Sequence, residues 1–227
     1  MTEASAAAIR PARPRTRPAT DLALIASFAA LIAVCALLPA IPVGGLVPIT
    51  LQTFGVMLAG AVLGSRRGLL AVLLYLAVGA IGLPVFSGGA AGLAPFAGPT
   101  VGYLVAFPLA AFLTGFLVER LPRKRVATSI PLIFAAGFLS SLIFIHPLGA
   151  LGLAWRADMT IGQAFLFDLT FIPGDIIKNI LMAIVATSVH RAFPALLPVR
   201  GKFAQPVAAG SADAAQSTDS GRGTISA

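Results

Sequence analysis

The chain consists mainly of long apolar stretches that are interrupted by short segments rich in Pro, Gly or charged residues. A membrane-spanning helix needs about 20 consecutive apolar residues, whereas the strands of a membrane barrel are about ten residues of alternating polarity. The pattern therefore predicts an all-α integral membrane protein with six transmembrane helices. The candidate helices are residues 21–39, 51–64, 67–83, 99–119, 129–153 and 174–193.

The two ends of the chain lack this apolar pattern. Residues 1–20 are rich in Arg, Pro and Ala, and residues 201–227 are rich in Ala, Ser, Gly and Asp. Such compositions predict disordered tails. We therefore expect a basic tail at residues 1–20, a six-helix membrane domain at residues 21–195, and a second tail at residues 196–227.

Composition agrees with a membrane protein, because 58% of the residues are hydrophobic and only 11% are charged. About a quarter of a soluble domain is charged. The single cysteine, Cys35, excludes an intrachain disulfide and a metal cluster built from cysteines. His146 and His190 have no His, Cys or acidic neighbour at the spacing of metal ligands, so no metal site is expected.

The net charge of +8 would suit nucleic acid, but its distribution favours another explanation. With six spans, 14 of the 16 basic residues fall on one side of the membrane. They are Arg10, Arg13, Arg15, Arg17, Arg66, Arg67, Arg120, Arg123, Lys124, Arg125, Arg191, Arg200, Lys202 and Arg222. Basic residues mark the cytoplasmic side of membrane proteins. Both termini are therefore predicted to be cytoplasmic, and nucleic-acid binding is not needed to explain the charge.

The loops predicted on the outer side are long, apolar and rich in glycine and phenylalanine. They are residues 40–50, 84–98 and 154–173. Their aromatic residues are compatible with anchoring at the membrane interface. Glycine-rich loops also suit a mobile lid over an outward-facing pocket. The sequence leaves both interpretations open.

The last predicted helix begins with polar residues that a membrane does not accommodate cheaply. At helical spacing, Asp175, Lys178, Asn179 and Met182 share one face. Asp175 and Lys178 form either an ion pair at a helix end, with the lysine reaching for water, or the polar part of a pocket. A lysine near a helix N-terminus opposes the helix dipole, which favours the pocket. The ligand would be small, with a polar head and an apolar body.

Three segments resemble the BioY family, the biotin-specific S-components of energy-coupling factor transporters. They read VPITLQTFGVMLAGAVLG, GLPVFSGGAAGLAPFAGPTVGYLVAFPLAAFLTG and FIPGDIIKNILMA, and the resemblance covers about residues 21–195. It implies a six-helix S-component bundle in the bacterial inner membrane, with glycine-rich outer loops. It also implies a pocket formed by helices four to six, and as partners a membrane-embedded T-component and two ATP-binding-cassette ATPases.

By this resemblance, Asp175 and Lys178 match the residues that contact the ureido ring of biotin, and Ser87–Gly98 match the loop that closes on the ligand. Some members of the family place an amide or a cation within or just after that loop, where this chain has Ala90, Ala91 and Leu104. The partner of the biotin carboxylate therefore stays open. The remaining donors are backbone N–H groups and the side chains of Ser87, Thr100 and Tyr103.

Two other sets of residues complete the expected sites. Ala26 and Ala30 form a small-residue face on the first helix, of the kind that S-components use to dock the T-component, with Ala29 and Ala33 as the alternative register. The candidate substrate-binding residues are Asp175, Lys178, Asn179, Tyr103, Ser87 and Gln52. Capping of the second helix is the simpler interpretation of Gln52, whereas Tyr103 either lines the pocket or packs internally.

The expected function is high-affinity binding and uptake of biotin, without a cofactor. The chain has no GxxxxGK[ST] phosphate-binding loop, so ATP-driven import would depend on partner ATPases. An S-component for another small vitamin and a solitary facilitator are the alternatives within transport. An intramembrane enzyme is disfavoured, because the predicted helices lack paired catalytic carboxylates, a metal cluster and a nucleophile with its base.

Overall fold

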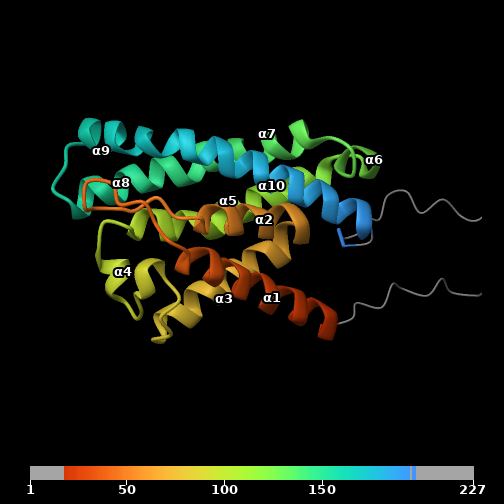
Figure 1. Ribbon diagram of the computed structural model, residues 1–227, viewed down its shortest axis with the longest axis horizontal. Helices are drawn as coiled ribbons and strands as arrows, with labels where there is room; N and C mark the ends of the chain where they lie inside the picture. The colour runs from red at the N-terminus through yellow and green to blue at the C-terminus, as the bar shows by residue number, and fades with distance from the viewer. Residues whose placement is uncertain (1–17, 195, 198–227) are drawn as a thin grey trace, which may run out of the picture.

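The computed structural model describes residues 18–194, 196 and 197 (Figure 1), so most of both predicted tails lies outside the described residues. Within the described residues the secondary structure is helical, apart from an isolated antiparallel bridge between Ile41 and Ile49. The elements are α1 (Pro18–Leu37), α2 (Gln52–Leu63), α3 (Ser65–Ala80), η1 (Ser87–Gly89), α4 (Ala94–Ala97), α5 (Val101–Arg120), α6 (Arg123–Val126), α7 (Ile130–Ser140), the π-turn η2 (Ser141–Ile145), α8 (His146–Arg156), α9 (Ile161–Asp168), η3 (Leu169–Phe171) and α10 (Ile172–Ala192).

Four helical runs are long and apolar enough to cross a membrane. They are Pro18–Leu37, Val101–Arg120, Ile130–Arg156 and Ile161–Ala192, with 20, 20, 27 and 32 residues. α2 and α3, which match the second and third predicted spans, contain only 12 and 16 residues. The structure thus confirms a helical protein with several membrane-capable helices, and leaves the total of six spans as a prediction.

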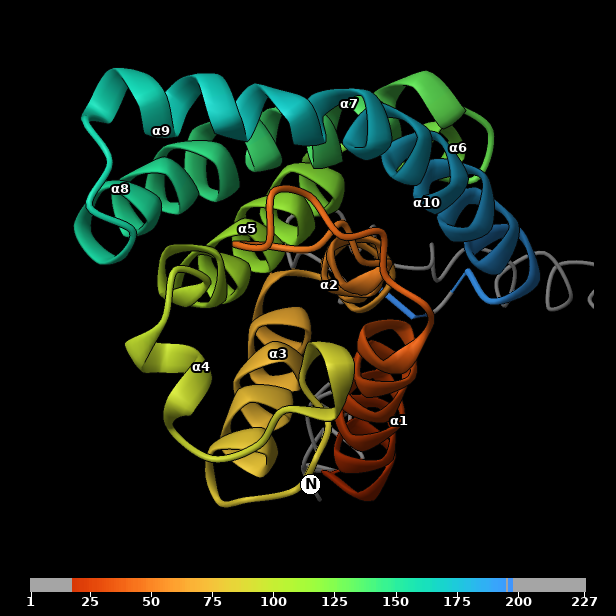
Figure 2. The same ribbon diagram turned by 60° about the vertical axis from the view of Figure 1, so that its left-hand side comes forward.

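The predicted outer loop at residues 154–173 is wrong. α8 continues to Arg156, and only residues 157–160 separate it from α9. Thr160 starts α9 with a capping box: its hydroxyl accepts a hydrogen bond from the Gln163 backbone N–H at 3.3 Å, and the Gln163 side chain accepts from the Thr160 N–H at 2.9 Å. Pro173 does not break the helix, because it lies in the first turn of α10. Figure 2 shows α9 and α10 as one continuous helical run above α8 and α7.

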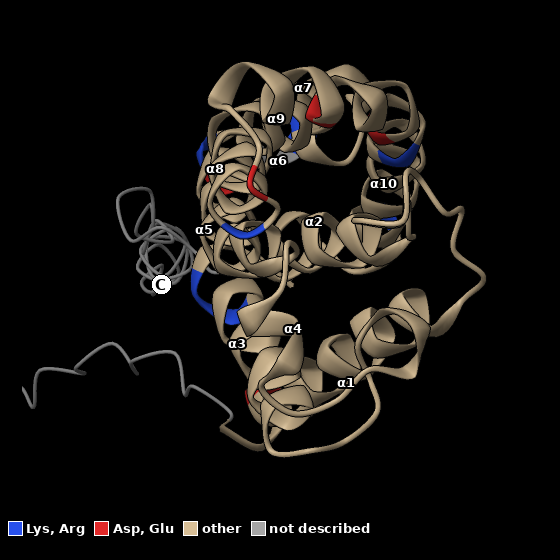
Figure 3. Ribbon diagram, turned by 90° about the vertical axis from the view of Figure 1, so that its left-hand side faces the viewer, with Lys and Arg blue, Asp and Glu red and all other residues tan. Residues whose placement is uncertain are grey.

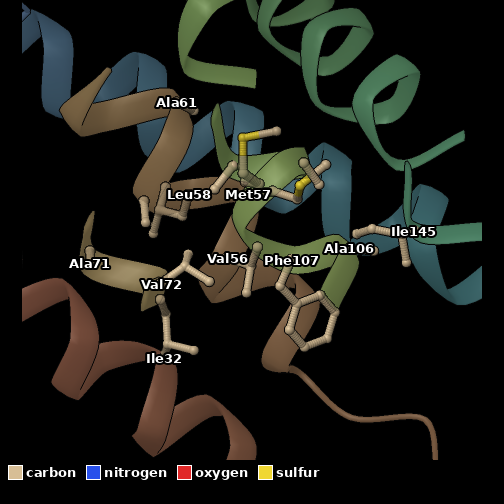
Figure 4. Packing of buried hydrophobic residues seen from close by; sticks show 14 of the residues in the cluster. Ile32, Val56, Met57, Leu58, Ala61, Ala71, Val72, Ala106, Phe107 and Ile145 are labelled. Atoms are coloured by element: carbon tan, nitrogen blue, oxygen red, sulfur yellow. The ribbon is translucent and has the colours of Figure 1, made fainter. Parts of the chain in front are cut away.

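α2 lies at the centre of the bundle and packs against α1, α3, α5 and α10. Figure 4 shows Val56 of α2 between Val72 of α3 and Phe107 of α5, with Ile32 of α1 nearby. Ala59 and other small residues of α2 are fully buried. Lipid tails are as apolar as the core, so close van der Waals contact between small residues, rather than removal from water, holds such helices together.

The two ends of the bundle differ in chemistry. The start of α1, the end of α10 and α6 lie at one end, here called the basic end, whereas α4 and the α8–α9 turn lie at the other, the pocket end (Figure 1). At the basic end, Arg67 pairs with Asp21 at 2.7 Å and donates to the Leu196 carbonyl at 3.0 Å. Viewed from the pocket end, few positions along the ribbon carry charge (Figure 3). The charged residues inside the bundle are therefore exceptional.

Candidate functional site

Two adjoining cavities open at the pocket end and share Pro48, Gln52, Ser87, Thr100 and Leu104. The first, here called the head cavity, is small, at about 60 Å³, and reaches α10. The second, the tail cavity, is larger, at about 250 Å³, and lies under the glycine-rich loop. The other residues of the head cavity are Val47, Ile49, Thr50, Thr53, Tyr103, Phe107, Ile145, Phe171, Asp175 and Lys178.

The first turn of α10 brings Asp175 and Lys178 into the head cavity. The Lys178 ammonium lies 3.0 Å from Asp175 Oδ1, and the Thr53 hydroxyl accepts from Lys178 at 3.2 Å and donates to Asp175 at 3.4 Å. Asp175 is only 3% exposed and the Lys178 side chain 11%. Lys178 therefore does not reach for water. The predicted ion pair is present, and it faces the cavity.

Three of the other candidate residues also line the cavities. Tyr103 packs its ring against Phe171, with the ring centroids 5.7 Å apart, and lines the head cavity. The Gln52 amide donates to the Tyr75 hydroxyl at 2.9 Å, so it is part of the internal packing as well as of both cavity walls. Ser87 contributes to both walls from the turn that begins the glycine-rich loop.

Asn179 does not reach either of the two cavities. One turn below Asp175, its side-chain amide donates to the Asp175 backbone carbonyl at 2.9 Å. Its Oδ1 atom is buried without a hydrogen-bond partner among the described residues, close to Gly137 of α7. This position suits support of the first turn of α10 better than contact with a ligand in the head cavity.

The aromatic residues of the outer segments divide between the two expected roles. Phe86 is buried edge-on against Tyr75 and Phe96, and it occupies the space that Gly79 leaves open. Phe165 of α9 is 52% exposed, as expected of a residue that faces lipid or its interface. The loop after Phe86 adopts positive φ angles at Gly88, Gly89 and Gly92, which only glycine adopts without strain.

Two functional candidates were missed by the sequence analysis. His146 Nδ1 lies 2.6 Å from Asp168 Oδ2, and His146 Nε2 lies 3.5 Å from Asp175 Oδ2. The Tyr103 hydroxyl donates to Asp168 Oδ1 at 2.7 Å. Asp168 fell in the segment taken for a loop. A charged residue in an apolar stretch was the available signal, since intramembrane charges usually serve a function.

Within residues 18–194, 196 and 197, no three His, Cys, Asp or Glu side chains are grouped to hold a metal ion.

Comparison with known families decides the classification of this helical bundle. A sequence model described as BioY family matches residues 5–195. The chain belongs to the BioY family. Among BioY proteins, it is 45% identical over 183 residues to the "Biotin transporter BioY" of Rhizobium etli, a match that covers 79% of this chain and 97% of that protein. It is also 45% identical over 194 residues to the "Biotin transporter BioY" of Rhodobacter capsulatus, covering 80% and 98%.

A solved structure shows that the BioY architecture extends to this chain. The "Crystal structure at 2.1 A of the S-component for biotin from an ECF-type ABC transporter" superposes with a TM-score of 0.73 at 34% identity. The match covers 79% of this chain and 95% of that chain. The family resemblance predicted from the three sequence segments is therefore confirmed, and the protein is a multi-pass membrane protein.

Proposed function

We propose that this BioY-family chain is the biotin-binding S-component of an energy-coupling factor transporter and mediates biotin uptake. It is a membrane transport protein and not an enzyme. The buried Asp175–Lys178 pair carries the proposal, because it faces a cavity with otherwise largely apolar walls. The likeness to proteins that are named biotin transporters supports it.

The chemistry of the head cavity matches the ureido ring of biotin. The ring N–H groups donate to the Asp175 carboxylate, and the ring oxygen accepts from the Lys178 ammonium. Phe107, Phe171 and the ring of Tyr103 line the same cavity and suit the apolar body of the ligand. The two oppositely charged groups, together with the aromatic walls of the same cavity, fix the orientation of the molecule.

The valerate arm then extends toward the tail cavity. Its described lining contains no Lys or Arg, so the carboxylate meets neutral donors there. Ser87 is the first candidate, since Thr100 already donates its hydroxyl hydrogen to the Pro95 carbonyl at 2.9 Å and Tyr103 donates to Asp168. Backbone N–H groups of the glycine-rich loop are the other candidates.

The purified chain in detergent tests this proposal by isothermal titration with biotin. We expect saturable one-to-one binding that excess thiamine or riboflavin does not displace. Displacement by another vitamin would identify an S-component of different specificity. Uptake of labelled biotin by cells that express the chain with and without the partner ATPases separates an S-component from a solitary facilitator.

We further propose that Ala26 and Ala30 of α1 form the face that docks the T-component. Both are exposed, whereas Ala29 is buried and Ala33 half-buried, which favours the first of the two registers. Small residues four positions apart allow a partner helix to approach closely. The chain has no phosphate-binding loop, so ATP-driven import would require partner ATPases, to which the T-component would connect it.

Replacing Ala26 and Ala30 with Leu is expected to abolish ATPase-dependent uptake and co-purification with the T-component, while biotin affinity stays unchanged. The added side chains hold the partner helix away. Ile177→Trp, at an exposed position of α10, adds comparable bulk elsewhere and should preserve both properties. Wild-type co-purification of the double variant would place the docking face elsewhere.

The termini and the basic end are proposed to be cytoplasmic, with α2 and α3 as short spans, of which α2 is central. At about 1.5 Å per residue, α2 is shorter than the hydrocarbon core, which is about 30 Å thick. Its burial among α1, α3, α5 and α10 removes the need to match the lipid thickness. This arrangement completes six spans.

Labelling of single cysteines tests this orientation. In a Cys35→Ala background, cysteines at Ser5 and Ser211 are expected to resist an impermeant thiol reagent in intact spheroplasts. A cysteine at Thr160, in the α8–α9 turn, is expected to react. Reaction of either tail from outside would overturn the orientation, and lysed spheroplasts provide the control that all three sites are reactive.

A further inference from the structure

Four helices each contribute a buried polar side chain to one connected cluster. Tyr103 of α5 donates to Asp168 of α9 at 2.7 Å, and Asp168 lies 2.6 Å from His146 of α8. His146 in turn lies 3.5 Å from Asp175 of α10, which pairs with Lys178. His146 is 5% exposed and Asp168 1%. The polar contacts thus continue from Asp175, in the wall of the head cavity, into the interior of the bundle.

The backbone around His146 is built to bring its ring to this place. The π-turn Ser141–Ile145 ends directly before it, and such turns rotate the following helix relative to the preceding one. One turn later, a side chain at Gly149 would collide with the Tyr103 ring. The absence of that side chain lets Tyr103, Asp168 and His146 meet.

The contacts of the two ring nitrogens of His146 indicate that one proton lies between His146 and Asp175. Asp168 Oδ2 is the acceptor for Nδ1, so Nδ1 carries a hydrogen. Nε2 faces Asp175 Oδ2 and has no hydrogen-bond partner among the described residues. If neither Nε2 nor Oδ2 carried a proton, two lone pairs would face each other in a dry site. A single proton on either atom turns this contact into an attraction.

The charges around His146 also indicate one additional proton in the cluster. Two carboxylates, Asp168 and Asp175, and one ammonium, Lys178, face it from α9 and α10. Tyr103 from α5 and Thr53 from α2 contribute only neutral hydroxyls. One further proton makes the cluster neutral overall, and a buried net charge is costly.

We propose that His146 and Asp175 share one proton and that this proton site is coupled to ligand binding. The coupling rests on the proposed function, in which Asp175 receives the ureido N–H groups. The proton holds the carboxylate in place from behind while Lys178 holds its other oxygen. When the proton leaves, Nε2 repels Oδ2, and the carboxylate no longer points toward the ligand. Affinity for biotin therefore falls as the pH rises. His146 and Asp168 act as positioning residues.

Titration calorimetry with biotin on the full-length protein tests the coupling between about pH 5 and pH 9, a range that includes the interval of about pH 5–8 in which an ordinary imidazole changes its charge. We expect affinity to fall at least threefold with rising pH in the wild type. His146→Gln should bind more weakly and with a flat pH profile. Asp168→Asn, which keeps the shape of the side chain, should shift the pH at which the affinity for biotin falls. Two buffers of different ionisation enthalpy should give different heats at high pH, because binding there takes up a proton.

His190→Gln is the matched control. His190 is also buried, and its Nε2–H donates to the Ala61 carbonyl at 2.9 Å, near the basic end of α10. Its loss should leave the wild-type pH dependence in place. Melting curves of every variant confirm folding, and the two-buffer measurement on the wild type stands even if a variant does not fold.

Infrared titration of the ligand-free protein separates failure of this inference from failure of the proposed function. A carboxylate band that titrates in the wild type and is absent from His146→Gln supports the proton site even if biotin does not bind. Biotin binding with the same pH profile in the wild type and His146→Gln, together with no such band, would overturn the proton site and leave the biotin-binding function intact.

Discussion

Asp175→Asn is expected to weaken biotin binding by at least about tenfold, since each factor of ten corresponds to about 1.4 kcal/mol. The substitution keeps the shape but removes the charge that Lys178 and Thr53 contact. A buried polar group without its partner costs about 1–3 kcal/mol, and more when it is charged. In the variant, Lys178 and the ureido N–H groups are left with a single, uncharged acceptor oxygen. Calorimetry with biotin measures the loss.

Lys178→Met is the companion substitution, because it keeps the apolar stem and removes the ammonium. It should weaken binding by a similar factor. Lys124→Met, which removes a lysine from α6 at the basic end, is the control and should bind biotin as the wild type does. If the Asp175–Lys178 pair serves only the helix end, both variants will melt at altered temperatures but retain wild-type affinity, and the pair will have no part in binding.

The sequence predicted the positions of most helices because their signal is local. A continuous apolar stretch is visible without knowledge of its neighbours, so Val101–Arg120 and the core of α10 matched closely. The same holds for Asp175 and Lys178. Their three-residue spacing places them on one helix face in any fold, and a polar face in an apolar helix is exceptional.

The His146–Asp168 contact could not be predicted from the sequence, because it depends on two helices that form a hairpin. The residues are 22 positions apart, and their contact requires both a turn confined to residues 157–160 and a helical α9. The loop predicted at residues 154–173 covered the whole of α9.

The position of Asn179 relative to the cavity depends on contacts that are distant along the chain. Its spacing from Asp175 placed it on the polar face of α10, but it lies one turn deeper than Asp175 and does not line the head cavity. Which turn of a polar face meets the ligand depends on α2 and α5, whose contacts the periodicity of α10 does not contain. Tyr103, by contrast, lies in the first turn of α5 and lines the head cavity. This is one of the two roles that were expected of it.

Gly102→Ala is expected to lower the melting temperature and to weaken biotin binding together. Gly102 of α5 lies directly against the backbone of α8, where an added Cβ would collide with the Leu148 carbonyl oxygen and press on Gly152. Neither neighbour is the end of a flexible side chain, so the two helices must separate. Overpacking of this kind costs about 1–3 kcal/mol, and occasionally more.

The weaker binding follows from what the two helices carry. Tyr103 is the next residue of α5, and α8 begins with His146, so separation of the helices disturbs the hydrogen bonds of both side chains to Asp168. Gly162→Ala in α9 is the matched control, because no atom lies near the position of its added methyl group. Thermal melts in detergent and biotin titrations of both variants measure the effect. Equal melting temperatures for the two variants would contradict a backbone contact between α5 and α8, and normal affinity in a destabilised Gly102→Ala would separate this helix contact from the ligand site.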